Sequence, residues 1–244
     1  MRKLIYTPVL LLVCIASKLY AQREFEINIV ENASAITILD IKGDIEVKRS
    51  EEQVIKVAIA LYKDSKFYGK ADIPKSIEVV ENGPMVKLKG ISDDSNRKYQ
   101  LTIPMGWPLK FNLKNNLDEL TIIGNKTPLE VKSKGCDISL IDNSGPISIS
   151  TTHGDVFVSW DNAMLKSDSY ITTVSGEIEM EVDEQSSFGF EIRPYQGSIE
   201  NTLNMKLSYM HNLKIPKAFE GNYNNGSAKI FLETTVGDII LKEK

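Results

Sequence analysis

The sequence is poor in the side chains that usually form metal centres or disulfide frameworks. It contains two cysteines and two histidines among 244 residues. Cys14 lies in the apolar N-terminal segment, so a chain without that segment keeps only Cys136 and forms no internal disulfide. Neither His153 nor His211 has a second His or a Cys at ligand spacing, whereas a zinc site needs three or four ligands.

Positive charge is in slight deficit, with 29 Lys and Arg against 33 Asp and Glu. Loss of the N-terminal segment removes Arg2, Lys3 and Lys18, which leaves 26 basic residues and a net charge of about −7. A mildly acidic chain repels phosphate backbones and anionic membrane surfaces. Nucleic acid is therefore not expected as a partner, and no cofactor is expected.

Long apolar runs are confined to the N-terminus. Arg2 and Lys3 precede an almost wholly apolar run that ends at Ser17, and the small residue Ala21 follows shortly after. This order is typical of a secretory signal peptide, here residues 1–21. The run is shorter than the roughly 20 residues of a membrane-spanning helix. The sequence thus predicts an exported protein, in the periplasm, on the surface of a Gram-negative bacterium or secreted, without a transmembrane segment in the mature chain.

Alternation of apolar and polar residues dominates the mature chain. It runs from Phe25 to Ile59 and again around Tyr99, with many β-branched residues. A period of two indicates strands, and little in the mature chain has the period of a long helix. Pro104 and Pro108 enclose a short corner between two strands. We therefore expect an all-β protein whose residues 22–115 form an N-terminal strand-rich part.

One short phrase recurs through the second half: a polar lead-in, a glycine, in most copies a small or acidic residue, and apolar residues at alternate positions. Its glycines stand at positions 135, 154, 176, 197 and 237. A period near 20 residues is the signature of a solenoid, in which each coil buries its apolar face against the next. We expect one repetitive domain over 22–244, with β-helix-like coils over 116–244 and an irregular excursion at about 201–226.

The acids that follow the glycines are the first candidate site. In a solenoid, Asp137, Asp155 and Glu177 would stack about 5 Å apart, the spacing of neighbouring strands. Carboxylates at this distance repel each other, and bound Ca²⁺ would relieve the repulsion. However, the tandem glycines of calcium-binding β-rolls are absent, and acidic side chains also suit turns. We predict no resident metal, with these three residues as the calcium candidates.

Four aromatic residues form the second candidate site. Trp107 lies in the proline-flanked corner, and Tyr195, Tyr209 and Tyr223 lie near the C-terminus. Exposed aromatics are common in recognition surfaces, so these residues are candidates for a binding surface. The favoured alternative is that they cover the ends of the solenoid. No catalytic residue is predicted, and the G-x-S-x-G nucleophile motif is absent.

The signal peptide, IKGDIEV, YQLTIPMGWPLKF, HGDVFVSW and SGEIEMEV together resemble the bacterial "putative adhesin" domain family. This family, also known as the auto-transporter adhesin head domain, consists of secreted, repetitive β proteins of unknown function. The resemblance implies a β-helix-like solenoid and a non-enzymatic, adhesin-like or scaffold-like role in the cell envelope. It supplies no catalytic residues. The composition, rich in Lys, Asn and Ile, resembles that of Bacteroidota envelope proteins.

Three functions stay open. An adhesin-like binding protein would use the long flat faces of a rigid solenoid to bind a surface, a polysaccharide or an envelope protein. A polysaccharide-active enzyme is the first alternative, by analogy with parallel β-helices that host such enzymes. It would need paired carboxylates in a groove. A periplasmic sensor or envelope-assembly partner is the second alternative.

Overall fold

The computed structural model describes residues 23–27, 33–61, 77–91, 97–114, 119–210 and 217–244. These residues form strands and no helix, which confirms the all-β class. The predicted signal peptide lies outside the described residues. Within them, no helix has the length and apolarity needed to span a bilayer.

The strands form two sheets that face each other. Sheet A consists, in spatial order, of β1 (Arg23–Ile27), β4 (Ile55–Leu61), β7 (Arg97–Pro104), β3 (Asp44–Ser50), β9 (Glu119–Ile123), β11 (Asp137–Asn143), β13 (Val156–Trp160), β15 (Ile178–Val182), β21 (Ile239–Glu243) and β17 (Ile199–Asn201). Sheet B consists of β18 (Ser208–Tyr209), β19 (Phe219–Tyr223), β16 (Phe188–Gln196), β20 (Lys229–Val236), β14 (Ser169–Ser175), β12 (Ile147–His153), β10 (Leu129–Ser133), β8 (Leu109–Leu113), β2 (Ala35–Leu39), β6 (Met85–Gly90) and β5 (Ile77–Asn82).

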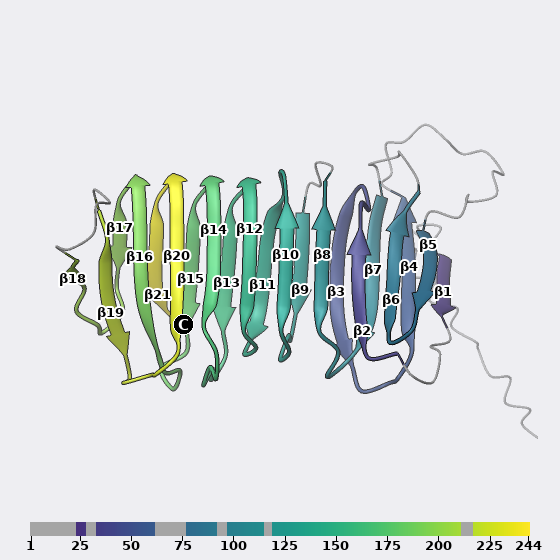
Figure 1. The fold of residues 1–244 in the computed structure, drawn as a ribbon, viewed down its shortest axis with the longest axis horizontal. Coiled ribbons are helices and arrows are strands. Elements are labelled where there is room, and N and C mark those ends of the chain that lie inside the picture. Colours follow the sequence, from purple (N-terminus) through teal and green to yellow (C-terminus); the bar gives the residue numbers. More distant parts are fainter. Residues whose placement is uncertain (1–22, 28–32, 62–76, 92–96, 115–118, 211–216) are drawn as a thin grey trace, which may run out of the picture.

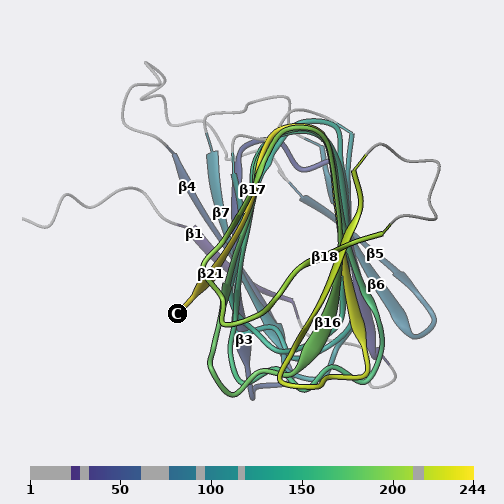
Figure 2. The ribbon, with the colours of Figure 1, turned by 90° about the vertical axis from the view of Figure 1, so that its left-hand side faces the viewer.

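A strand of sheet B and the following strand of sheet A make one coil. Neighbouring coils pair in parallel and in register, so that Ile138 of β11 lies between Leu120 of β9 and Val156 of β13. The strands lie side by side along the long axis (Figure 1), and the coils superpose on an oval outline when viewed along that axis (Figure 2). This arrangement confirms the predicted β-solenoid.

The core lies between the two sheets and follows the alternation of the sequence. In β15, Ile178, Met180 and Val182 are fully buried, whereas Glu179 lies on the outer face. Large aromatic side chains also belong to the core, and the ring centroids of Trp160 and Phe188 lie 5.7 Å apart. Each fully buried aliphatic or aromatic side chain contributes roughly 1.5–3 kcal/mol.

The order of the coils in space differs from their order in the chain at both ends. The last coil, β20–β21, pairs with β14–β15 on one side and with β16–β17 on the other (Figure 1). Likewise, β2–β3 lies between β6–β7 and β8–β9. The double gap between Gly197 and Gly237 therefore has a topological cause. After β14–β15, the chain passes over the adjoining position in the stack and forms the end coil β16–β17. The segment β20–β21 then fills the position that was passed over.

The segment expected as an irregular excursion covers the C-terminal end of the core. β19 pairs antiparallel with β16, and the short β18 pairs with β19. Leu203 is buried, and Met205 and Leu207 pack against the core as half-buried side chains. Residues 211–216 lie outside the described residues.

At the corner that leads from sheet B to sheet A, the backbone of each coil packs directly against the backbone of the neighbouring coil. A Cβ added at Gly154 would lie 2.2 Å from the carbonyl oxygen of Cys136. A Cβ at Gly176 would lie 2.1 Å from the carbonyl oxygen of Gly154, and Gly237 stacks on Gly176 in the same way. Real Cβ atoms do not approach closer than 3.0 Å, so these positions require glycine.

Cys136, and not Gly135, stands at this corner in its coil. The backbone of Cys136 lies directly beneath Gly154, and the Cys136 side chain is buried. Asp137 therefore aligns with Asp155. If Gly135 were the corner residue, Asp137 would lie one residue further from the corner than Asp155 does. Burial raises the pKa of the Cys136 thiol to about 12, so the thiol stays protonated and unreactive.

Buried asparagines connect neighbouring coils at the opposite corner. The side-chain amide of Asn125 donates to Oδ1 of Asn143 at 3.0 Å and to the carbonyl oxygen of Thr127 at 2.8 Å. The amide of Asn143 in turn donates to the carbonyl oxygen of Gly145 at 2.8 Å. These bonds satisfy polar groups that would otherwise be costly to bury.

Replacement of Gly154 tests the packed corner. Gly154→Ala is expected to lower the free energy of unfolding by at least about 2 kcal/mol, because φ at Gly154 is 112° and a methyl group meets the Cys136 carbonyl. Gly189→Ala is the matched control, since the nearest atom lies 3.4 Å from its added Cβ. Denaturant unfolding measures both. Equal stability of the two variants would contradict the close packing.

Candidate functional site

Except where β7 carries Lys98 and where Ser198 precedes β17, each coil places an acidic side chain at the start of its sheet A strand or one residue before it. The register aligns these residues in one row, the acidic column: Asp44, Glu119, Asp137, Asp155, Glu177 and Asp238. All of them except Asp238 line, together with Glu179, a shallow hollow of about 470 Å³ on the outer face of sheet A.

The carboxylates of this column hold neighbouring coils together. The backbone N–H of Asp155 donates to Oδ1 of Asp137 at 2.9 Å, and that of Glu177 donates to Oδ1 of Asp155 at 2.8 Å. At the end of the column, Ser198 donates to Oδ1 of Asp238 from its backbone at 2.7 Å and from its hydroxyl at 2.9 Å. These bonds give the column a structural role.

The three calcium candidates, Asp137, Asp155 and Glu177, lie in this column, one on each coil. No group of three or more His, Cys, Asp or Glu side chains is placed to hold a metal ion within the described part of the chain. The oxygens of Asp137 and Asp155 instead accept backbone hydrogen bonds.

The column has an electrostatic cost at Glu177. Partial burial raises the pKa of its carboxyl, and repulsion from Asp155, Glu179 and Asp238 raises the pKa further. At the end of the column the opposite holds, because the hydrogen bonds from Ser198 lower the pKa of Asp238. Ionised Glu177 therefore destabilises the fold, whereas ionised Asp238 stabilises the attachment of β17.

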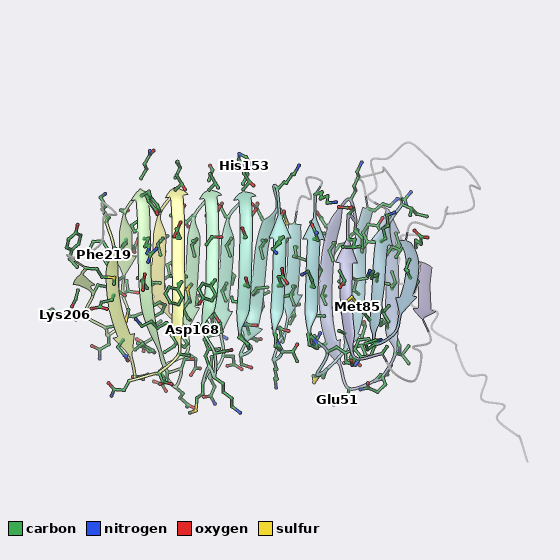
Figure 3. The ribbon with its side chains drawn as sticks, viewed as in Figure 1. Glu51, Met85, His153, Asp168, Lys206 and Phe219 are labelled. Atoms are coloured by element: carbon green, nitrogen blue, oxygen red, sulfur yellow. The ribbon has the colours of Figure 1, made fainter. Side chains whose placement is uncertain are left out.

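The outer face of sheet B has a different chemistry. Pro108, Pro128 and Pro146 directly precede β8, β10 and β12 and form a row across the strand starts. Beside them runs a row of outward side chains in register, namely Thr37, Lys110, Glu130, Ser148 and Tyr170. The two rows line a groove of about 590 Å³, the sheet B groove, which extends from Met85 to Tyr170. Met85 and Asp168 mark its two ends on this face (Figure 3).

An aromatic pair closes one end of the sheet B groove. Tyr170 of β14 and Phe231 of β20 are register partners, and their ring centroids lie 4.8 Å apart with planes at 5°. Tyr170 is 46% exposed. Both residues precede a corner glycine, Gly176 or Gly237, by six positions. That shared spacing shows in the sequence that both residues occupy the same position of their coils, whereas their adjacency depends on the placement of β20 beside β14.

The charges in the sheet B groove neutralise one another. Glu130 forms ion pairs with Lys110 at 2.7 Å and with Lys132 at 2.8 Å, and the hydrogen bonds from both lysines lower its pKa. Asp168 accepts a hydrogen bond from the backbone N–H of Lys229. The groove is thus nearly neutral, in contrast to the hollow on sheet A.

The structure separates the four aromatic residues predicted as a binding surface. Trp107 and Tyr223 are 6% and 4% exposed and belong to the core, so their side chains are not available as a binding surface. Tyr195 is half-buried on β16. Tyr209 is exposed on β18, where its ring packs edge-on against Phe219 at the C-terminal end.

His153 lies at the exposed rim of sheet B (Figure 3), and His211 lies outside the described residues.

Comparison with known proteins gives a family and a fold. The family model described as Toastrack DUF4097 matches residues 109–242. A "putative cell adhesion protein" from Clostridium sporogenes is 15% identical with a TM-score of 0.50, over 91% of this chain and all of the other chain. A "putative adhesin" from Bacteroides fragilis is 11% identical with a TM-score of 0.33, over 92% of this chain and 98% of the other. A comparison with curated proteins gave no match.

The charge on Glu177 generates a pH-dependent prediction. Glu177→Gln is expected to raise the midpoint of thermal unfolding at about pH 7, because it removes a partly buried charge and the repulsion between that charge and its acidic neighbours. The gain should fade below about pH 4, where glutamate is protonated in both the folded and the unfolded chain. Thermal unfolding across pH measures this, with Glu181→Gln on the same strand as the control. A gain that is independent of pH would refute the account.

A second prediction concerns metal ions. Calcium chloride and sodium chloride at equal ionic strength are expected to give the same unfolding midpoint, because the carboxylates are spread one to a coil. Both salts screen repulsion along the column to a similar extent. A rise specific to calcium that disappears in Asp155→Asn would show that the column binds the ion.

Proposed function

Because the chain belongs to the Toastrack DUF4097 family, we propose that it is an exported, adhesin-like binding protein that acts without catalysis through the outer face of its solenoid. The fold that the chain shares with the "putative cell adhesion protein" from Clostridium sporogenes supports this proposal. The signal peptide predicted over residues 1–21 supports export to the envelope or beyond it.

One observation carries the proposal, namely the regular outer face of sheet B. Parallel strands in register turn outward side chains into rows, such as Ser150 of β12 beside Thr172 of β14. Because every coil is paired on both sides along this stretch, the rows form a rigid surface that loses little conformational freedom on binding. A repeating surface also supports several weak contacts at once, which multiplies affinity.

The acidic column does not favour a polysaccharide-active enzyme. Asp155 and Glu177 are adjacent acids, but Asp155 is engaged in the hydrogen bond that holds the next coil. A hydrolytic site needs one carboxylate free to act as an acid and another free to act as a base or nucleophile. We therefore assign the column to the fold and binding to sheet B.

The test compares matched charge insertions on the two faces. The mature chain, residues 22–244, carries a fluorescent label and is titrated onto intact bacterial cells and onto separated polysaccharide and protein fractions of the envelope. Ser150→Arg with Thr172→Arg alters sheet B, and Thr121→Arg with Ser139→Arg alters register partners on sheet A.

Saturable binding is expected for the wild type and for the sheet A variant. The sheet B variant should bind at least about tenfold more weakly, a loss of about 1.4 kcal/mol. Binding to an envelope protein alone would favour the sensor or assembly role. Absence of saturable binding, or turnover of a polymer, would contradict the proposed function.

A further inference from the structure

We propose that the sheet B groove binds an uncharged polysaccharide chain whose sugar ring stacks on Tyr170, an inference that rests on the binding function proposed above. The groove crosses six adjoining strands, β6, β2, β8, β10, β12 and β14. At the spacing of strands in a sheet, this is a run of roughly 24 Å along the solenoid axis. Such a shape suits an extended polymer better than a compact small molecule.

The geometry of the aromatic pair turns one ring face of Tyr170 into the groove. Rings that lay flat and side by side on the sheet could not bring their centroids to 4.8 Å. The two rings must therefore stand on edge and stack along the solenoid axis. Phe231 covers one face of Tyr170, and the other face is directed toward Ser148 on the next strand.

The groove offers the mixture of groups that a sugar needs. The rings of Pro128 and Pro146 provide apolar surface beside the aromatic wall, and both residues line the groove. The hydroxyls of Ser148 and Ser167, which also line it, can donate and accept hydrogen bonds. A sugar ring has an apolar face and a hydroxyl rim, and small numbers of polar groups around an apolar floor are typical of ligand sites.

Charge selects an uncharged polymer. Among the residues that line the groove, Lys110 is paired with Glu130 and Asp168 adds a negative charge, so the lining itself does not attract an anionic chain. The mature chain carries a net charge of about −7, with an acidic column on the opposite sheet, so it repels polyanions at long range. A neutral polysaccharide needs no cation in the groove and is not repelled by the negative charge of the chain.

A protein segment is a weaker fit. Extended peptides gain affinity by adding a strand to an open sheet edge. This groove lies on the face of sheet B, where β8, β10 and β12 are each hydrogen-bonded to neighbours on both sides. A peptide there would leave most of its backbone groups unpaired with protein, whereas a polysaccharide carries its polar groups on its rim.

The test uses calorimetric titration of the mature chain with defined probes. These are neutral hexasaccharides of β-linked glucose and of mannose, alginate oligosaccharides as the anionic arm, and a proline-rich peptide. A neutral hexasaccharide is expected to bind, with Tyr170→Phe within about threefold of the wild type because the ring remains. Tyr170→Ala should bind at least about tenfold more weakly.

Val174→Ala is the matched control, since Val174 is 50% exposed on the same strand and lies outside the groove. It should bind as the wild type does. Thermal unfolding shows whether Tyr170→Ala is folded. If it is not, Ser148→Arg replaces it, since an arginine there fills the space against the ring and should abolish binding.

Three results would overturn the inference. They are wild-type affinity in Tyr170→Ala or Ser148→Arg, tighter binding of alginate or of the peptide than of either neutral sugar, and failure of both neutral sugars to bind. If labelled chain still binds cells in these cases, the proposed function stands and only the ligand is wrong. If no cell surface is bound, the proposed function itself fails.

Discussion

The close contact between stacked corners determines the rest of the structure. At Gly154, Gly176 and Gly237, the carbonyl of one coil lies where the next coil would otherwise carry a side chain. This contact sets the strand register, because a slip of one residue would place a Cβ against the carbonyl and turn the apolar residues outward. Register in turn aligns every outward side chain with its equivalent in the neighbouring coil. The acidic column and the sheet B groove both follow from this alignment.

The two faces use the same alignment in opposite ways. On sheet A, alignment brings acids together, and their mutual repulsion is offset in part by hydrogen bonds such as that from the Asp155 backbone to Asp137. On sheet B, alignment places Lys110 beside Glu130 and Tyr170 beside Phe231, so charges cancel and rings stack. The first face stabilises the coil, whereas the second presents a neutral, partly aromatic surface to solvent.

Alternation and glycine spacing were sufficient to predict the strands, the period and the buried face of each strand. They could not predict where each coil stacks, because the local pattern of β20–β21 suits any position in the array. The insertion of this coil between β14–β15 and β16–β17 arises only from tertiary packing. For the same reason, the Tyr170–Phe231 pair was missed, since its members are adjacent only after that insertion. The burial of Trp107 was not predicted, because the flanking prolines indicate a corner but do not show whether the side chain at that corner is buried.

The packed backbone corner aligns the coils that form the neutral groove on sheet B, and we propose that an uncharged polymer stacks there on Tyr170. A crystal structure of the mature chain soaked with a neutral hexasaccharide tests it most directly. The predicted result is sugar density over Pro128 and Pro146 with one ring against the free face of Tyr170. Sugar bound instead in the hollow of sheet A, beside Asp155 and Glu177, would contradict the claim.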